Sequence, residues 1–387
     1  MTEAVAPIAR TEAEAAAQSL SSGAAGDALL AIERASSGAA DWNTARQLIK
    51  QATARGVDSA RHAGLFYGLP AITFMLHRTS ADGRERYVVA RRDLDRHVRR
   101  LTRKRLRAAE QRARTGTAAS FAEYDLFAGL GGLGILLLHT QPGTDELRDV
   151  LRHLVRLTEP RRSAGLTVPG WWVDHHPDPI LPTPGGHANN GMAHGAAGVL
   201  AVLAHATRHQ LHVDGQADAI ARLCTWFDHW RQHSPHGPWW PQWLTRDQLR
   251  TGDPGDSPPR PSWCYGAAGI GRALQLAALA AGDHTRRREA EDAIAACLTD
   301  TQIDRLAEPG ICHGLAGLYQ TAARAAADAA TPLIGRRLPA LAARLTATAP
   351  GGNSTFLTGN TGVAIVTETI RTGQPPSTRW DQCLLIT

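Results

Sequence analysis

The stretches RPSWCYGAAGIG (residues 260–271) and GICHGLAGLYQ (residues 310–320) decide how this sequence is interpreted. Each places a cysteine two residues before a Gly-x-x-Gly, and the second adds a histidine directly after its cysteine. Two of the five cysteines in the chain therefore occupy the same position of one local motif. This coincidence indicates an internal repeat, which is the feature to establish first.

The motif recurs along the whole chain as a glycine, two variable residues, a small residue and an apolar segment of helical type. Seven stretches have it, although Ala71 takes the place of the second glycine in one of them. The leading glycines are Gly23, Gly68, Gly129, Gly195, Gly266, Gly314 and Gly359. Their spacings are 45, 61, 66, 71, 48 and 45 residues. The shortest of these intervals is long enough for two helices and their connections.

Each repeat predicts one buried helix and one half-exposed helix. The segments after the motifs are apolar nearly all round, as expected of helices between two layers. The segments between them are amphipathic and charge-rich, as in DELRDVLRHLVRLTEP (residues 145–160). Seven such helical hairpins closing on themselves form an all-α, double-layered barrel, the α/α-toroid, which we predict as a single domain over residues 1–387. The N-terminal ends of its parallel inner helices would meet at one mouth.

Two longer intervals, at about residues 159–187 and 233–262, are rich in proline, glycine and tryptophan. They predict long loops with little regular structure. Because both lead into a motif glycine, we expect them around the mouth. Five tryptophans there could wall a peptide-binding cleft or could simply fasten the loops. They are Trp171, Trp172, Trp239, Trp240 and Trp243.

The side chains expected at the mouth are found by counting back from each leading glycine. Cysteines stand two positions before the glycine in consecutive repeats, as Cys264 and Cys312, and His313 stands one position before it. Equivalent positions of neighbouring inner helices lie side by side, so these three residues should converge. Two thiolates and an imidazole suit Zn²⁺ and leave a fourth position open, as in catalytic sites.

The alternative for a free cysteine is that it serves as a small buried hydrophobe. That interpretation suits Cys224, Cys297 and Cys383, which lie elsewhere in their repeats. For Cys264 and Cys312 the shared register and the adjacent histidine favour metal binding.

Three further residues are candidates for the chemistry at the mouth. His194 has the mouth register without a neighbouring cysteine, which suits a general acid or base, although a histidine can also be satisfied within a core. Asp125, four residues before Gly129, could orient a histidine or hold a substrate proton. Arg260, four residues before Cys264, could stabilise an oxyanion. His175 and His176 lie in a loop outside the register, and we leave them out.

The charge and composition narrow the class of protein further. The net charge is +6, and arginines are densest in residues 91–116. The favoured interpretation is a solvated helix, and the alternative is a docking face for an acidic peptide. No aromatic residues interleave that patch, which argues against nucleic acid. The N-terminus has no signal-peptide pattern and the apolar runs are too short to span a bilayer, so we expect a soluble cytoplasmic protein without a disulfide framework.

Three of the repeats together are specific for one family. AHGAAG (residues 193–198), WCYGAAG (263–269) and ICHGLAG (311–317), in this order, resemble the lanthionine synthetase C family, the cyclases of lanthipeptide biosynthesis. The resemblance extends over the repeats from Gly23 to Gly362. It implies an α/α-toroid in which Zn²⁺ is bound by Cys264, Cys312 and His313. It also implies that His194, Asp125 and Arg260 form the acid–base set around the metal.

The reaction that the resemblance implies is an intramolecular conjugate addition. A cysteine of a precursor peptide, held on zinc as a thiolate, adds to the β-carbon of a dehydroalanine or dehydrobutyrine, and the α-carbon is then protonated. The product is a lanthionine or methyllanthionine thioether ring. His194 would move the protons and Arg260 would stabilise the enolate oxygen.

The same resemblance implies partners. The first repeat begins by residue 19, so we expect a stand-alone cyclase whose dehydrated precursor, leader segment included, comes from a separate dehydratase. An exporter is a further expected partner, and a peripheral association with a membrane biosynthetic complex is one option for its location.

Three rival functions stay open at this point. A related zinc enzyme could add glutathione or another thiol to a different acceptor, and only the substrate would distinguish it. A protein prenyltransferase subunit is also a zinc-containing α/α barrel, but its ligand pattern differs from WCYG with CHG. A non-catalytic scaffold that binds a precursor peptide would have no reason to keep three ligands and an acid–base histidine in register.

Overall fold

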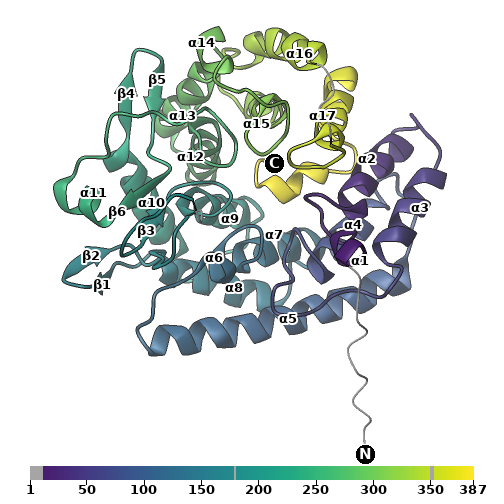
Figure 1. The fold of residues 1–387 in the computed structure, drawn as a ribbon, viewed down its shortest axis with the longest axis horizontal. Coiled ribbons are helices and arrows are strands. Elements are labelled where there is room, and N and C mark those ends of the chain that lie inside the picture. The colour runs from purple at the N-terminus through teal and green to yellow at the C-terminus, as the bar shows by residue number, and fades with distance from the viewer. Residues whose placement is uncertain (1–11, 178–179, 349–352) are drawn as a thin grey trace, which may run out of the picture.

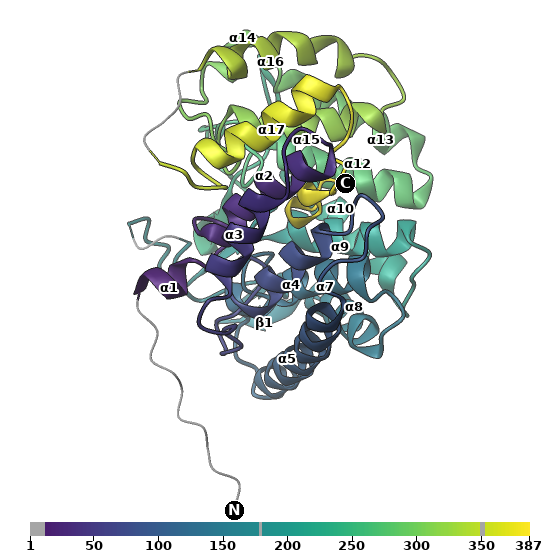
Figure 2. The same ribbon diagram turned by 90° about the vertical axis from the view of Figure 1, so that its right-hand side faces the viewer.

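Helices dominate the computed structural model, which describes residues 12–177, 180–348 and 353–387 (Figure 1). Seven inner helices form its centre: α2 (Ala24–Ser36), α4 (Leu69–Arg78), α7 (Leu130–Thr140), α9 (Ala196–Arg208), α12 (Ala267–Ala281), α15 (Leu315–Ala327) and α17 (Asn360–Thr372). Each inner helix contacts the next, and the last, α17, packs against the first, α2, which also lies beside it in Figure 2. The ring is closed, and the predicted α/α-toroid is confirmed.

An outer layer of helices surrounds this ring. Six inner helices are each followed by an outer helix that packs on them: α3 (Asn43–Ala52), α5 (Val88–Arg114), α8 (Asp145–Leu157), α10 (Gln216–Trp230), α13 (His284–Ala296) and α16 (Leu338–Ala347). The seventh unit differs from the predicted hairpin. After α17 the described chain makes only the short 3₁₀-helix η2 (Trp380–Leu384) and turns back into the ring (Figure 1).

Close backbone packing explains why each inner helix begins with the glycine motif. Every leading glycine is the N-cap of its helix. The second glycine lies over the carbonyl oxygen of the residue six positions earlier. A Cβ at Gly132 or Gly362 would stand 2.0 Å from that oxygen, which no side chain tolerates. Ala71 occurs in the one repeat whose leading glycine, Gly68, has a positive φ of 66°, so the chain enters that helix by a different path.

The C-terminal tail fills the middle of the ring, where Figure 1 places the C-terminus. Trp380 and residues 383–386 are completely buried. Side chains of α12 and of the segment before it bind the tail's carbonyl groups: Trp263 Nε1 donates to Leu384 O at 2.9 Å, and Arg272 Nε donates to Ile386 O at 2.9 Å. Because buried backbone groups need partners, these bonds fix the tail as part of the core.

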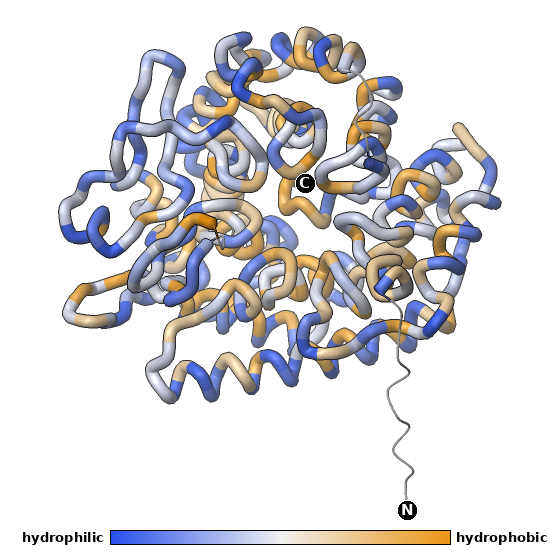
Figure 3. Tube along the Cα trace, viewed as in Figure 1, coloured by the Kyte–Doolittle hydropathy of each residue, from blue (hydrophilic) through white to orange (hydrophobic). Residues whose placement is uncertain are grey.

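Hydropathy follows the two layers (Figure 3). The inner helices are mainly apolar, and α7, with the sequence LGGLGILLLHT, is buried on nearly every side. The outer helix α5 is mainly polar, with only Val98, Leu101, Thr102 and Ala109 buried. This matches the solvated arginine-rich helix favoured from the sequence. None of the described helices combines the length and apolarity that crossing a bilayer requires.

Residues 159–187 and 233–262 contain more regular structure than the sequence predicts. Three antiparallel pairs form among short strands: β1 (Arg161–Ser163) with β2 (Leu166–Val168), β3 (His187–Asn189) with β6 (Trp243–Thr245), and β4 (Gln232–Ser234) with β5 (Gly237–Trp239). The prediction of irregular loops is therefore incomplete. The remaining short elements are α1 (Glu12–Ala16), α6 (Phe121–Tyr124), α11 (Arg246–Thr251), α14 (Asp300–Ile303) and η1 (Gly335–Arg337).

Gly362→Ala should test whether the second motif glycine is required by its close contact with the carbonyl oxygen six residues earlier. Its new Cβ would meet the carbonyl oxygen of Phe356 at 2.0 Å, and we expect a loss of about 2–4 kcal/mol in the free energy of unfolding. Gly143→Ala is the matched control, because its Cβ would meet nothing within 4 Å. Equal thermal stability of the two variants would contradict this requirement.

Candidate functional site

A ring of backbone hydrogen bonds, here called the mouth ring, joins the segments that precede the seven inner helices. Each segment donates to the next one around the toroid, and the last bond closes the circle. The bonds are Leu20 N to Phe66 O, Phe66 N to Phe127 O, Leu126 N to Ala193 O, Ala193 N to Cys264 O, Cys264 N to Cys312 O, Cys312 N to Leu357 O and Leu357 N to Ser21 O, at 2.8–3.4 Å. The mouth ring thus brings equivalent positions of successive repeats next to one another.

Cys264, Cys312 and His313 meet at one place on the mouth ring. One ligand atom from each lies within 4.8 Å of the other two. Cys264 is buried, whereas Cys312 and His313 are partly exposed. In the described part of the chain no fourth histidine, cysteine or carboxylate joins this group. The arrangement is a three-donor site that is open toward the mouth.

Glu308 orients His313. Its Oε2 lies 2.7 Å from His313 Nε2, which leaves Nδ1 as the nitrogen free to face the thiols. A carboxylate on the far nitrogen of a ligating histidine is a common device for fixing the ring and raising its basicity. Glu308 was not selected from the sequence, since a glutamate five residues before a histidine has no distinctive spacing.

The pKa values of the two thiols are shifted in opposite directions. The hydrogen bond with Cys312, and then that with His313, holds the pKa of Cys264 well below its usual range despite burial. The same bond with Cys264, together with burial, raises the pKa of Cys312. The hydrogen bond to Cys264 also raises the pKa of His313. Cys264 is therefore the thiol that loses its proton first.

His194 and Asp125 form the second pair at the mouth. Asp125 Oδ2 lies 2.6 Å from His194 Nδ1, and Asp125 Oδ1 accepts from Ala128 N and Gly129 N at 2.8 Å each. One carboxylate therefore both binds the backbone that leads into α7 and holds the imidazole. Because Nδ1 is held by the carboxylate, Nε2 is the nitrogen left for a ligand.

Aromatic rings enclose the His194 imidazole. Phe121 and Phe127 stack on it with ring centroids at 5.1 and 5.0 Å. Tyr265 lies at 6.2 Å from His194, and Trp243 packs edge-on against Tyr265. Burial raises the pKa of Tyr265, so its hydroxyl stays protonated and can donate a hydrogen bond. Tyr265 was not singled out from the sequence, although it stands one position before its motif glycine.

Arg260 lies at the edge of this group rather than inside it. The residue is exposed and, among the described residues, its side chain has no ion pair or hydrogen bond. Its charge nevertheless acts on Cys312, where it opposes the larger effects of Cys264 and of burial on the pKa of that thiol. Arg260 is therefore close enough to act on the mouth electrostatically.

The loop side chains divide between the two alternatives raised by the sequence. Four tryptophans are buried and fasten the loops: Trp171, Trp172, Trp239 and Trp240. Trp243 is half-buried beside Tyr265 and so borders the mouth. His175, left out of the sequence-based site, packs edge-on against Phe121 at 4.6 Å, and His176 Nδ1 accepts from Thr183 N.

The other three cysteines are buried away from this cluster. Burial raises the pKa of Cys224 to about 11 and that of Cys297 to about 12, and it raises the pKa of Cys383 as well. Thiols of this kind pack as small apolar side chains, which is the role expected for them from the sequence.

The double role of Asp125 can be tested by two substitutions. Asp125→Asn keeps an oxygen for the N–H groups of Ala128 and Gly129, whereas Asp125→Ala leaves them without it and should lower the free energy of unfolding by about 1 kcal/mol more. Both should alter the His194 tautomer, visible in the ¹⁵N shifts of its ring, because Nδ1 loses its anionic partner. Equal stability of the two variants, with an unchanged His194 spectrum, would contradict this geometry.

Comparison with known proteins places the chain in a family. The sequence profile described as "Lanthionine synthetase C-like protein" matches residues 14–385. Among solved structures the chain is similar to nisin cyclase, with a TM-score of 0.79 and 20% sequence identity over 96% of this chain and 93% of that one. At this identity the likeness shows the fold alone. A comparison with curated proteins found no match. The profile match over nearly the whole length shows that the chain belongs to the lanthionine synthetase C-like family.

Proposed function

We propose that the protein is a peptide cyclase that closes thioether rings by adding a cysteine thiol to a dehydroalanine or dehydrobutyrine of the same peptide. The observation that carries this proposal is the meeting of Cys264, Cys312 and His313 within 4.8 Å at an open mouth. The carboxylate-backed His194 on the same mouth ring supports it, because the reaction has a proton to remove and a proton to deliver.

The donor set fits Zn²⁺. Two thiolates and one imidazole are ligands that zinc prefers, and three protein ligands leave one position for a substrate. The lowered pKa of Cys264 favours the thiolate that a metal needs, and Glu308 fixes the His313 ring. Zinc bound there would supply the chemistry of keeping a substrate thiol deprotonated at neutral pH.

His194 would move the protons of the reaction. Its Nε2 is left free by the bond between Nδ1 and Asp125, so it can accept the proton of the substrate's cysteine. The sulfur then forms a bond to the β-carbon, and the electron pair of the double bond moves toward the neighbouring carbonyl oxygen. The resulting enolate takes a proton at its α-carbon, which His194 Nε2 can return. Atoms and charge balance without any redox partner.

Arg260 and Tyr265 would assist at the enolate oxygen. Arg260 is exposed and has no partner among the described residues, so its guanidinium is available to a bound peptide. The Tyr265 hydroxyl, kept protonated by burial, is a second donor beside His194. Both would stabilise charge that develops only as the sulfur–carbon bond forms.

The chemistry also suggests the partners. A thiolate can add only after the β-carbon has become electrophilic, so the substrate must be a precursor peptide dehydrated beforehand. We propose that a separate dehydratase supplies it, that an exporter receives the product, and that the cyclase works in the cytoplasm as a stand-alone enzyme. The alternatives are addition of glutathione to another acceptor and a purely peptide-binding scaffold.

A synthetic peptide with one dehydroalanine and one cysteine tests the proposal. The parent protein should consume the free thiol without changing the peptide's mass, measured by thiol titration and mass spectrometry. Cys312→Ala should abolish ring closure because it removes a zinc ligand, and His194→Ala should lower kcat/KM by about 10²–10⁴-fold. Cys224→Ala and His236→Ala, which lie away from the mouth, are the matched controls.

Two results would favour the rival functions. If the peptide keeps its thiol and instead gains the mass of added glutathione, the enzyme joins separate molecules. If the peptide binds but never reacts, even with zinc supplied, the protein is a scaffold. Either result would contradict peptide cyclisation by this site.

A further inference from the structure

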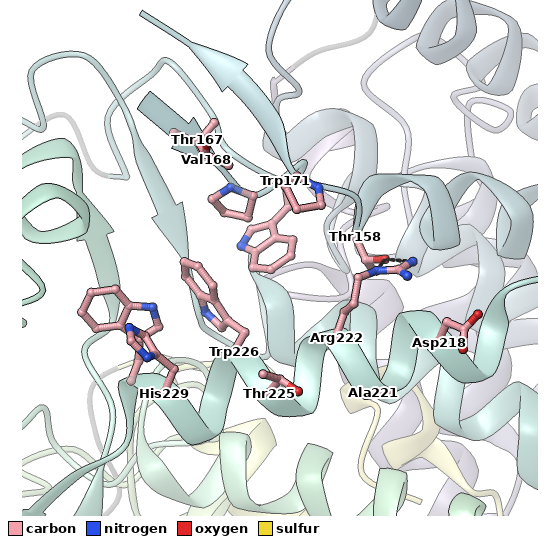
Figure 4. A pocket seen from close by; sticks show the side chains of 13 residues that line it. Thr158, Thr167, Val168, Trp171, Asp218, Ala221, Arg222, Thr225, Trp226 and His229 are labelled. Carbon is pink, nitrogen blue, oxygen red and sulfur yellow. Dashed lines mark hydrogen bonds between the residues drawn. The ribbon is translucent and has the colours of Figure 1, made fainter. Parts of the chain in front are cut away.

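The hairpin β1–β2 lies between two hollows that the cyclising site does not use. One is an apolar pocket of about 740 Å³ between the hairpin and α10 (Figure 4). The other is a groove of about 460 Å³ between the hairpin and the C-terminal parts of α5 and α8. Pro160 lines both, so the two hollows adjoin. Together they are called the hairpin face below.

The pocket of the hairpin face is walled by tryptophans. Trp171 and Trp226 pack edge-to-face at 5.1 Å, and Figure 4 shows Trp226 on α10 near Thr225 and His229 with Trp171 facing it. The indole Nε1 atoms of Trp171 and Trp230 are buried without a hydrogen-bond partner among the residues that the structure describes, which is unusual for buried donors. An apolar pocket of this size has room for an aromatic or long aliphatic side chain together with its neighbours in a peptide.

The groove of the hairpin face is cationic. Arg156, Arg161 and Arg162 line it, and none of them forms an ion pair among the described residues. Arg161 donates only to a backbone carbonyl and Arg162 only to neutral oxygens. Arg112 is neutralised by Glu123, and two carboxylates, Glu110 and Glu159, also line the groove. The surplus of unpaired arginine charge fits an acidic segment beside the apolar pocket.

The hairpin face is connected to the mouth. Trp226 Nε1 donates to Asn190 Oδ1 at 2.8 Å, and Asn190 belongs to the segment that carries His194. Val173, two residues after Trp171, forms a β-bridge with Ala119, which lies two residues before the Phe121 that stacks on His194. A chain bound at the hairpin face therefore lies on elements that lead directly into the site.

We infer that the hairpin face docks a segment of the precursor peptide outside the ring-forming part, in which an aromatic or long aliphatic side chain stands beside acidic side chains. The apolar residue occupies the tryptophan pocket and the carboxylates lie along the arginine groove. Docking raises the effective concentration of the reacting cysteine at the mouth. This inference rests on the proposed cyclase function.

A peptide fits this face better than a lipid surface does. The apolar part is lined by tryptophans that pack between a hairpin and a helix, whereas membrane insertion uses protruding apolar side chains. None of the large apolar side chains that the described residues expose lines the pocket. Anionic vesicles serve as the competing occupant in the test.

The test uses the full chain and a fluorescein-labelled peptide, Asp-Glu-Leu-Phe-Asp-Glu, followed by fluorescence anisotropy. Ala221→Trp narrows the pocket from an exposed position, and Arg156→Glu reverses a groove charge. Each should weaken binding by about tenfold, which corresponds to about 1.4 kcal/mol. Replacing the acids of the peptide by amides should have a similar effect, and added salt should weaken binding.

Matched controls separate docking from general damage. Ala217→Trp lies on the same helix outside the pocket, and Arg288→Glu is an exposed arginine on α13, so both should bind the probe within about twofold of the parent. The inference would be overturned if all variants bound the probe equally, or if the controls lost binding as well. It would also be overturned by arginine-dependent binding to phosphatidylserine vesicles without peptide binding. The probe has no cysteine and no dehydrated residue, so its binding is measured independently of cyclisation. Docking can therefore fail while cyclisation succeeds, and cyclisation can fail while docking succeeds.

Discussion

The mouth ring is the constraint on which the rest of the structure depends. Each of its seven backbone bonds joins the segment before one inner helix to the segment before another, and the circle closes between Leu357 and Ser21. Backbone bonds carry no side-chain requirement, so the ring can be kept while the side chains on it vary. The fold therefore presents a fixed circle of positions, a few of which carry chemistry.

The glycine motif exists to make that circle possible. The second glycines leave no room for a Cβ above the preceding carbonyl oxygens, and this close approach sets each inner helix against its own entry segment. The N-terminal ends of the inner helices then meet at the mouth and contribute positive potential there. That potential favours the thiolate at Cys264 and, in the proposed reaction, an enolate. On the other side, the buried C-terminal tail completes the core.

Much of this arrangement could be predicted from the sequence, because equivalent positions in successive repeats lie next to one another in the fold. The toroid followed from the seven glycine motifs, and the meeting of Cys264, Cys312 and His313 followed from their equivalent places in it. Other features could not be predicted, because they depend on contacts between distant segments. β3 pairs with β6 across more than fifty residues, and the tail binds Trp263 and Arg272 through carbonyl groups that have no sequence signature. Tyr265 was missed for the same reason, because its place beside His194 appears only when the neighbouring repeat is in position. Glu308 was missed for another reason, because a glutamate five residues before a histidine has no distinctive spacing.

The central claim is that two cysteines and a histidine from consecutive repeats hold one zinc ion with a position left open. Metal analysis of the purified chain after dialysis against Zn²⁺, followed by cobalt substitution, tests it most directly. We expect about one metal per chain and intense sulfur-to-cobalt absorption. Cys312→Ser should lose the metal or weaken that absorption sharply, while Cys224→Ser should keep both. A folded parent protein that takes up no zinc, or a cobalt spectrum that Cys312→Ser leaves unchanged, would contradict the account.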